Sequence, residues 1–483
     1  MIGKTNKPDP SRPNAWRPIA LLSCLGKGLE RLIARRLAYA AINQGVLNPQ
    51  QFGALPKRAA TDLVACLVHD IEVAWGKGQV ASLLITDIKG AFDSILRNRL
   101  TLRLRQQGWP TWLIRWVSSF QSDRSIIVRL GDFTSDSSRL TCGLPQGSPA
   151  SPVLFLLYIA PLLKVLKNPE RTFGYADDIG RLACGPTLEQ NVEDLKHDLE
   201  KILAWGRENA VDFEVTKTEL IHFTRPRTQA SKEDQPSLRL GVFDVSPSEE
   251  LRWLGVILDS HLSFKPHVNL WAAKGIQVAG RLRQLAGAFT GPPPLALRKA
   301  LHACALSVAF FGTEAWFPGL IAPSITLGRQ KHVQTGIQGH VETLNRVVKR
   351  AMRIALPAYS TTKNELIHFE SSTPPAEQLL AHIQRRFSLR LARLDSSHPL
   401  VSRSQPPTLP DRNNLPTRRG PNQKRMPRPT RLQRTINLCL SCPGPFFCQR
   451  YTPRRIHRRK VSIRRRPPPN LKIGKLPFHQ AIS

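Results

Sequence analysis

Apolar and polar residues recur along the chain with two periods, one typical of helices and one of strands. At residues 24–41 the apolar positions follow intervals of three and four, which predicts an amphipathic helix with one buried stripe. That stripe comprises Leu25, Leu29, Leu32, Ile33 and Leu37. Residues 61–75 repeat this pattern, and residues 188–205 predict a third helix.

Two shorter patterns predict strands that lie next to acidic residues. Residues 81–86 are mostly apolar and indicate a buried strand that ends at Asp87. Residues 173–184 indicate a hairpin whose turn falls at Ala176, Asp177 and Asp178. The two segments would bring three carboxylates together if their strands paired.

The remaining pattern divides the second half of the chain. Residues 225–250 are mostly polar and contain prolines, so we expect a loop or boundary there. Residues 265–400 are expected to be mainly helical, with a break at the Gly-Pro-rich segment 291–294. Residues 401–483 hold 20 Lys and Arg, one acid and 14 prolines. A segment of that composition buries too little apolar surface to offset its chain entropy, so we expect a disordered tail.

The charge of the whole chain points to a polyanionic partner. The 483 residues carry a formal net charge of +35, which indicates nucleic acid or an anionic membrane, although many non-catalytic chromatin proteins are as basic. No apolar run reaches the ~18 residues that a membrane helix needs. Residues 1–7 lack the apolar stretch of a signal peptide. We therefore expect no membrane partner, a reducing compartment and free thiols at the eight cysteines.

Adjacent acids at positions 177 and 178 are costly in an apolar hairpin, because two like charges so close repel one another without a cation. An ordinary acidic turn is the usual explanation of an isolated Asp-Asp pair. Asp87 supplies a third carboxylate at the end of a strand that could pair with the hairpin. Such an arrangement would suit two Mg²⁺ ions, which prefer carboxylate and phosphate oxygens.

A loop rich in glycine and proline, residues 143–152, precedes an apolar helix at residues 153–163. Taken alone it is an ordinary helix-leading loop. The loop lies between Asp87 and the acidic hairpin in the sequence. The order of these three segments resembles that of the reverse transcriptase family, in particular of non-LTR retrotransposons. Residues 87–93 resemble the first palm motif, 144–149 the second, and 173–178 the Tyr-x-Asp-Asp box.

Five more segments carry the same resemblance in the same order. They are residues 17–23, 25–30 and 51–53, similar to the fingers, 215–219, similar to the fourth motif, and 253–256, similar to the primer grip. Chance agreement of eight ordered segments is not expected. A looser likeness continues to about residue 390.

The resemblance implies catalytic roles for four residues. Asp87, Asp177 and Asp178 would be the metal ligands of a two-Mg²⁺ centre. Lys217 would protonate the leaving pyrophosphate, although a solvated lysine is nearly as good an interpretation. Asp93, six residues past Asp87, is expected to be structural.

Four further residues would bind the nucleotide. Arg17 would contact the triphosphate, because a planar guanidinium matches phosphate oxygens, with an ordinary surface arginine as the alternative. Phe92 would crowd a ribose 2′-hydroxyl and so favour dNTPs, with core packing as the alternative. Gln146 would line the nucleotide pocket, and Gly147 would let the backbone approach the incoming base.

The implied fold is an α+β right-hand polymerase. Residues 1–228 would form partial fingers and a palm with a small antiparallel sheet, and 229–290 the primer-grip segment and the start of the thumb. Residues 291–400 would form a helical thumb and C-terminal region, before the basic tail at 401–483. Because the chain begins inside the segment that resembles the fingers, part of the fingers is expected to be missing.

The expected function is RNA-directed DNA synthesis in retrotransposition, with an RNA template, a DNA primer and dNTPs as partners. The nucleus is the expected location, with a cytoplasmic ribonucleoprotein as a second one. Two alternatives stay open: an inactive retroelement remnant that binds nucleic acid through its charge, and a group II intron maturase-like protein.

Overall fold

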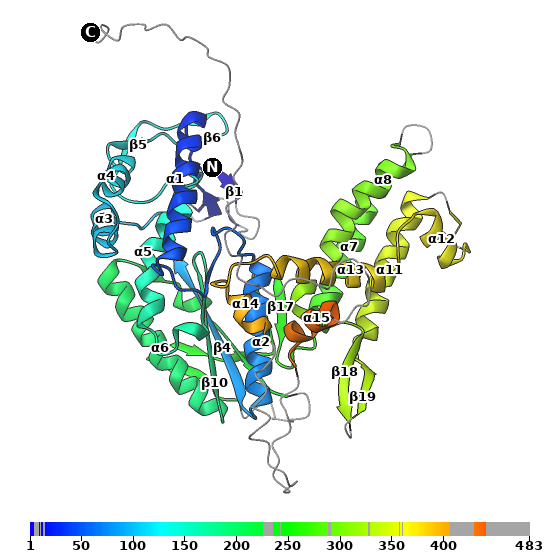
Figure 1. Cartoon of the computed structure of the whole chain (residues 1–483). Coiled ribbons are helices and arrows are strands. Elements are labelled where there is room, and N and C mark those ends of the chain that lie inside the picture. Colours follow the sequence, from blue (N-terminus) through cyan, green and yellow to red (C-terminus); the bar gives the residue numbers. More distant parts are fainter. Residues whose placement is uncertain are drawn as a thin grey trace, which may run out of the picture. The chain divides into compact units, whose positions relative to one another are not determined.

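Figure 1 shows the fold of the chain in a computed structural model. The structure describes residues 1–3, 9, 11–12, 15–225, 235–241, 243–287, 291–326, 329–356, 358–359, 361–405 and 429–440. Side chains of residues 321–334 and 437–440 are outside the description. The chain divides into two units, residues 1–439 and 440–483, and the first is the one whose fold follows.

A seven-stranded mixed sheet forms the centre of the first unit. Its strands run in the order β15–β12–β4–β10–β9–β3, and β11 also pairs with β4. Their bounds are β3 (Gln51–Phe52), β4 (Val80–Lys89), β9 (Thr172–Tyr175), β10 (Asp178–Gly185), β11 (Asp212–Phe213), β12 (Glu219–Phe223) and β15 (Pro247–Ser248). The central pairs are antiparallel, whereas β12–β15 and β3–β9 are parallel. The predicted antiparallel sheet is therefore confirmed at its centre and wrong at both edges.

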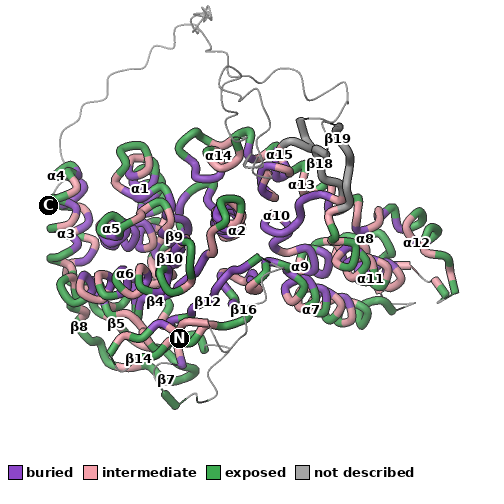
Figure 2. Tube along the Cα trace, turned by 90° about the horizontal axis from the view of Figure 1, so that it is seen from below, coloured by how far each residue is buried: buried purple, intermediate pink, exposed green. Residues whose placement is uncertain are grey.

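Helices cover both faces of this sheet. Successive side chains of β4 point to opposite faces, and both sets are apolar, so each face needs a covering layer. Leu83 and Ile85 join the core that contains α2 (Ala60–Gly76), whereas Leu84 joins the cluster beneath α6 (Leu188–Asn209). Buried residues, purple in Figure 2, gather on these strands and on the inner sides of the helices. The predicted helix after the Gly-Pro loop is α5 (Ser151–Val165), which is buried along nearly its whole length.

Helix α1 (Cys24–Asn43) forms where predicted but buries a different face. Leu25, Leu29 and Leu32 are 87%, 54% and 48% exposed, so the predicted stripe is wrong at these three positions. Ile33 and Leu37 are buried as predicted. The rest of the buried face consists of Glu30, Ala34, Ala38 and Ala41. Small alanines let α1 approach α5 closely, and that contact outweighs the larger leucine side chains in choosing the face.

Smaller elements surround the sheet. They are β1 (Ile2–Gly3), β2 (Trp16–Arg17), α3 (Arg97–Gln106), α4 (Thr111–Phe120), β5 (Arg124–Ile126), β6 (Arg129–Leu130), β7 (Phe133–Thr134), β8 (Ser138–Leu140), η2 (Pro169–Arg171) and η3 (Val215–Lys217). The predicted loop at 225–250 is wrong in part. Within it β13 (Leu238–Leu240) pairs with β14 (Phe243–Val245), and Leu238 is fully buried.

The second half of the unit is mainly helical, as predicted, after the hairpin β16 (Glu250–Trp253) to β17 (Val256–Asp259). The helices are α7 (Lys265–Arg283), α8 (Pro294–Ala300), η5 (Leu301–Leu306), α9 (Ser307–Ala309), α10 (Thr313–Trp316), α11 (Gln338–Ala355), α12 (Asn364–Glu370) and α13 (Ala376–Leu391). An unpredicted hairpin, β18 (Ile321–Thr326) to β19 (Arg329–Gln334), interrupts them. These helices share one continuous core with the α2 face of the sheet.

The expected disordered tail is wrong for two stretches. Residues Pro399–Ser404 form α14 and Arg431–Leu440 form α15, and Leu400 and Leu432 are buried. Residues 406–428 and 441–483 lie outside the described part of the chain. Composition misled the prediction because the two helices are held largely by charged side chains.

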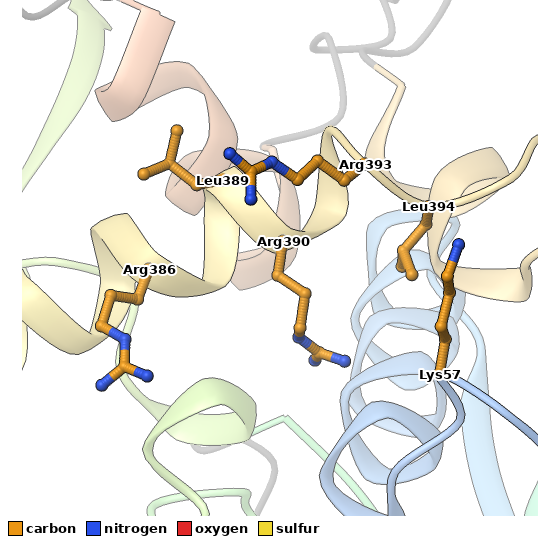
Figure 3. A pocket seen from close by; sticks show the side chains of 6 residues that line it. All are labelled: Lys57, Arg386, Leu389, Arg390, Arg393 and Leu394. Atoms are coloured by element: carbon orange, nitrogen blue, oxygen red, sulfur yellow. The ribbon is translucent and has the colours of Figure 1, made fainter. Parts of the chain in front are cut away.

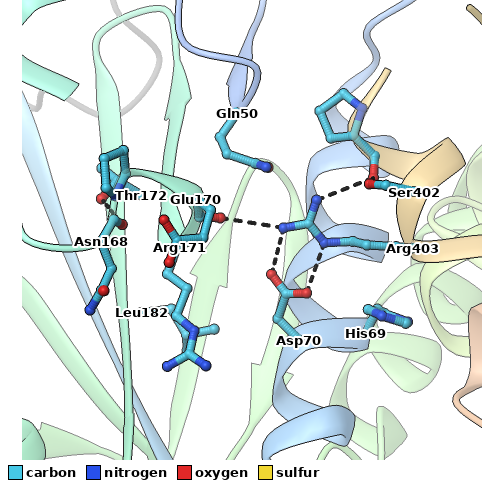
Figure 4. Close-up of polar contacts among 12 residues, drawn as sticks. Gln50, His69, Asp70, Asn168, Glu170, Arg171, Thr172, Leu182, Ser402 and Arg403 are labelled. Atoms are coloured by element: carbon cyan, nitrogen blue, oxygen red, sulfur yellow. Dashed lines mark hydrogen bonds and ion pairs between the residues drawn. The ribbon is translucent and has the colours of Figure 1, made fainter. Parts of the chain in front are cut away.

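Three arginines from the C-terminal helices bind three acids of α2. Arg403 makes a bidentate pair with Asp70, at 2.8 and 2.6 Å between nitrogen and oxygen, and only 10% of its side chain is exposed (Figure 4). The other two pairs are Arg390 with Asp62 and Arg431 with Glu72. Each pair balances charge that is at least partly buried, so the three pairs attach α13, α14 and α15 to α2.

Among the residues that the structure describes, no helix combines the length and apolar character needed to cross a membrane.

Candidate active site at the Asp177-Asp178 hairpin

A tight turn presents the two adjacent acids. β9 and β10 pair with Tyr175 opposite Asp178, so Ala176 and Asp177 alone make the connection. Ala176 adopts the left-handed conformation, with a φ of 55°. Gly53 lies against the turn, since a Cβ there would stand 3.0 Å from the backbone nitrogen of Ala176. The glycine that follows β3 is therefore required by close packing against the hairpin.

The third acid lies across the sheet from the second. Asp178 of β10 is the direct cross-strand partner of Asp87 in β4. The backbone nitrogen of Ile88 also donates to the carbonyl of Asp177, at 3.3 Å. Directly opposed residues on antiparallel strands have Cβ atoms about 5 Å apart, so two like charges there repel one another. The predicted meeting of the strand and the hairpin is confirmed.

Burial and mutual repulsion shift the acids toward their protonated forms. Burial raises the pKa of Asp178 to about 7, and the charges of Asp177 and Asp87 add to the rise. Burial also raises the pKa of Asp177, Asp87 adds to that rise, and Arg17 opposes it. The cluster therefore holds negative charge at a cost that a bound cation would remove.

Two cations lie at the edge of this cluster. The Nζ of Lys217 is 3.6 Å from Oδ2 of Asp87 and 3.5 Å from Oε2 of Glu214. The backbone nitrogen of Glu214 donates to the carbonyl of Asp87, at 2.9 Å, which fixes η3 beside β4. Arg17, exposed on β2, is near enough to act on the Asp177 charge. The structure therefore brings Lys217 and Arg17 to the predicted acids.

The donor set suits a hard divalent ion that also binds the substrate. In the described residues no three His, Cys, Asp or Glu side chains are already gathered around one point. Asp87, Asp177 and Asp178 nevertheless offer carboxylates on adjacent strands, two of them with raised pKa values. Mg²⁺ is usually held by one or two carboxylates together with substrate phosphates and water, so a partial protein ligand set is what its chemistry requires.

The Gly-Pro loop is tied to the segment that follows Asp87. The backbone nitrogen of Leu144 donates to the carbonyl of Phe92, at 2.7 Å, and Gly143 donates to the carbonyl of Ile95. The side-chain nitrogen of Gln146 donates to both oxygens of Asp93, at 3.1 and 3.3 Å. Asp93 thus has the structural role expected of it, and it orients Gln146.

Gly147 has a clear packing reason to be glycine, and it differs from the expected one. Its φ is +130°, and a Cβ there would stand 2.7 Å from the carbonyl oxygen of Ala20. Ala20 in turn donates its backbone N–H to the carbonyl of Gln146, at 2.7 Å. The close approach is made by the 17–23 segment, and contact with an incoming base stays a prediction.

Phe92 is half-buried and packs on a helix. Its ring centroid is 5.3 Å from that of Phe155 in α5, with the rings tilted by 37°. The side chain packs against the core while part of it remains accessible. Both interpretations, core packing and a steric gate, are compatible with this position.

Sequence reasoning missed Glu30, which is 8% exposed on α1 and accepts a hydrogen bond from the Ser148 hydroxyl. The same hydroxyl accepts the backbone N–H of Ala150, at 3.1 Å. Glu30 therefore links α1 to the loop that carries Gln146. The sequence did contain a signal for this role. Glu30 falls on the same helical face as the buried Ile33 and Leu37, and an acid on a buried face needs a hydrogen-bond partner.

Comparisons with known proteins agree with this geometry. The family model described as "Reverse transcriptase (RNA-dependent DNA polymerase)" matches residues 4–258. The chain is 26% identical over 416 residues to a probable RNA-directed DNA polymerase from transposon BS of Drosophila melanogaster, which covers 85% of this chain and 43% of that protein. It is 27% identical over 275 residues to the RNA-directed DNA polymerase from mobile element jockey of Drosophila funebris, covering 56% and 29%.

A solved structure of telomerase from Candida tropicalis with a fragment of telomeric RNA aligns over 75% of this chain and 55% of that one, at 11% identity and a TM-score of 0.38. The chain spans less than half the length of the curated relatives it matches. The family match covers more than half of the chain and includes the acids and the Gly-Pro loop. The chain therefore belongs to the reverse transcriptase family, and its named relatives are the polymerases of non-LTR transposons.

Proposed function

We propose that this chain is an RNA-directed DNA polymerase that adds dNTPs to a primer 3′-hydroxyl during retrotransposition. The observation that carries the proposal is the register of β4 and β10, which sets Asp178 opposite Asp87 with Asp177 in the adjoining turn. Family membership supports the same activity. The nucleus is the proposed location, because the products of such an element must reach chromosomal DNA.

Two Mg²⁺ ions would be held by Asp87, Asp177 and Asp178 and would supply activation of the primer hydroxyl and stabilisation of the pyrophosphate. Arg17 would pair with the triphosphate from the side of β2, where its guanidinium is exposed. Lys217, poised 3.6 Å from Asp87, would give its proton to the leaving pyrophosphate. These roles account for the two cations found at an acidic cluster.

Gln146 and Phe92 would shape the nucleotide pocket. Gln146 is oriented by Asp93, and Phe92 is braced by Phe155, so both side chains are positioned before substrate arrives. A braced aromatic ring would exclude a ribose 2′-hydroxyl. In the right-hand description of this fold, residues 1–228 would contribute to the fingers and form the palm. Residues 229–290 would supply the primer grip and 291–400 the thumb.

An inactive remnant that binds nucleic acid without polymerising is the second candidate, since the net charge of +35 alone supports binding. Primer extension on poly(rA) with an oligo(dT) primer, Mg²⁺ and dTTP separates the two. The wild-type chain is expected to extend the primer and Asp177→Ala to lose extension. Absence of extension by folded wild-type chain that still binds the primer–template would favour the remnant.

A further inference from the structure

Arg431, the first residue of α15, binds both helix α2 and the loop that follows hairpin β16–β17. Its backbone N–H donates to Oε2 of Glu72 at 2.6 Å, and its Nε lies 3.0 Å from Oε1 of the same carboxylate. Its Nη2 donates to the carbonyl of Leu262 at 2.8 Å. The guanidinium carbon also lies 5.1 Å from the centre of the Phe264 ring. One residue therefore connects α2 to this loop.

The loop between β17 and α7 has an unusual backbone. Leu262 and Phe264 both have left-handed φ values, 49° and 60°, which residues with a Cβ rarely adopt. Asp259, at the end of β17, accepts the backbone N–H groups of Ser263 and Phe264 at 2.8 and 2.7 Å. Such a conformation persists only where its surroundings fix it. Arg431 adds to that constraint, because it binds the carbonyl of one left-handed residue and the ring of the other.

The hairpin before this loop packs beside the candidate active site. Trp253 of β16 lies so close to Gly180 of β10 that a Cβ on the glycine would collide with the indole ring. Gly180 is two residues past Asp178 on the same strand, so both positions face the same side of the sheet, about 7 Å apart. Residues 253–256 are the segment that resembles the primer grip. A change in the angle of this hairpin would therefore move that segment relative to Asp178.

Helix α15 is attached to α13 as well. The side-chain nitrogen of Gln384 donates to the hydroxyl of Thr435 at 3.2 Å, and the Ser388 hydroxyl donates to the Thr435 carbonyl at 3.3 Å. Helix α13 is bound to α2 in turn through Arg390 and Asp62, and Figure 3 shows Arg390 pointing from α13 toward α2. The contact that α15 makes with the loop therefore comes from a helix that is itself held in place.

We propose that Arg431 is a positioning residue for DNA synthesis, which holds the loop after β17 against α2 and so sets hairpin β16–β17, with the primer terminus, beside Asp178. This rests on the proposed function, since only a polymerase has a primer to place. Arg431 would touch no reacting atom and would act through Leu262 and Phe264. A primer hydroxyl displaced by about 1 Å reacts on the order of 10²-fold more slowly. Loss of the contact should therefore slow the chemical step and leave primer–template binding intact.

Two acids of α2 provide a matched kinetic test. Glu72 binds Arg431, whereas Asp70 binds Arg403 of α14, which is not part of the loop contact. Single-turnover extension at saturating primer–template and dTTP gives an amplitude, which reports the fraction of folded enzyme, and a rate constant for the chemical step. Arg431→Gln and Glu72→Gln are expected to lower the rate constant by about tenfold or more. Their affinity for primer–template in EDTA is expected to be unchanged, and Asp70→Asn is expected to keep the wild-type rate constant.

Hydrogen exchange in EDTA tests the contact without catalysis. The amides of Ser263 and Phe264, which Asp259 binds, are expected to exchange severalfold faster in Arg431→Gln than in the wild type. In Asp70→Asn they are expected to exchange at the wild-type rate. A fragment from the buried helix α5 is the internal reference, because a general loss of stability would raise its exchange as well.

Three results would overturn the proposal. They are a wild-type rate constant in Arg431→Gln, unchanged exchange of the loop in that variant, and equal slowing in Asp70→Asn. Arg431→Gln combined with Glu72→Gln is expected to be no slower than the slower single variant, because both act through one contact. Slowing equal to the product of the two single effects would also contradict it. A wild-type chain that extends no primer would count against the proposed function, and the exchange result, which needs no activity, keeps the two failures apart.

Discussion

Asp178 stands directly opposite Asp87 in the register of β10 and β4, so two acids face one another across adjacent strands. Burial and the charges of Asp177 and Asp87 raise the pKa of Asp178 to about 7, from an ordinary value of 3.8. Between these two pH values, Asp178 is therefore protonated in the folded chain and ionised in the unfolded chain. Its contribution to stability is full below pH about 4 and is lost as pH rises through about 7.

Asp178→Asn is therefore expected to stabilise the metal-free chain at pH 8, on the order of 2 kcal/mol, and to stabilise it by less than half as much at pH 5. The amide resembles the protonated acid and never acquires its charge. Urea unfolding in EDTA at the two pH values measures the difference between variant and wild type. A gain that is the same at both values would contradict the account, as would a loss at pH 8.

Lys217→Gln is expected to slow the chemical step by about 10²-fold, because a general acid typically contributes that much. Single-turnover extension with saturating dTTP reports this step. Lys89→Gln is the control, since Lys89 is another cation beside Glu214. Lys217→Arg keeps the charge but is a poor proton donor, so recovery of the full rate by that variant would argue against proton transfer.

Gly147→Ala is expected to raise the KM for dTTP severalfold while the chain stays folded. The added Cβ would stand 2.7 Å from the carbonyl of Ala20, at a φ of +130° that disfavours side chains, so the loop carrying Gln146 must shift. Steady-state extension over a range of dTTP concentrations measures the change. Gly28→Ala is the control, because a Cβ at that helical position meets nothing within 4 Å. Unchanged kinetics in Gly147→Ala would show that the loop tolerates the contact.

Asp70→Ala is expected to destabilise the chain by about 3 kcal/mol, because it leaves the buried Arg403 without its carboxylate. Asp395→Ala removes a partner of Lys57 that is 76% exposed and is expected to cost less than about 0.5 kcal/mol. Urea unfolding of both variants gives the comparison. Equal effects would mean that the attachment of α14 to α2 does not depend on this pair.

The part of the fold that forms the candidate active site was predictable because its signals are local. The apolar run before Asp87, the apolar flanks of Asp177 and Asp178, and the glycine and proline of the loop each dictate a strand, a hairpin or a turn over a few residues. Their order along the chain then identified the family. The register that sets Asp178 against Asp87 follows from the pairing of two short apolar strands.

The features that could not be predicted from the sequence depend on contacts between residues far apart in the chain. Leucines at 25, 29 and 32 make a convincing apolar stripe, yet α1 buries its alanines because α5 is close. Arg403 and Arg431 belong to a segment with the composition of a disordered tail. Their carboxylate partners, Asp70 and Glu72, are more than 300 positions away on α2, so charge count alone suggested solvation.

The central claim is that Asp87, Asp177 and Asp178 form the metal centre of a polymerase. Mn²⁺ is a paramagnetic substitute for Mg²⁺, and its binding to the complex with primer–template and dTTP can be followed by electron paramagnetic resonance. The account predicts tight Mn²⁺ binding by the wild type, its loss in Asp177→Asn, and its retention in Asp212→Asn, which alters an exposed acid of β11. Undiminished Mn²⁺ binding by Asp177→Asn would contradict it.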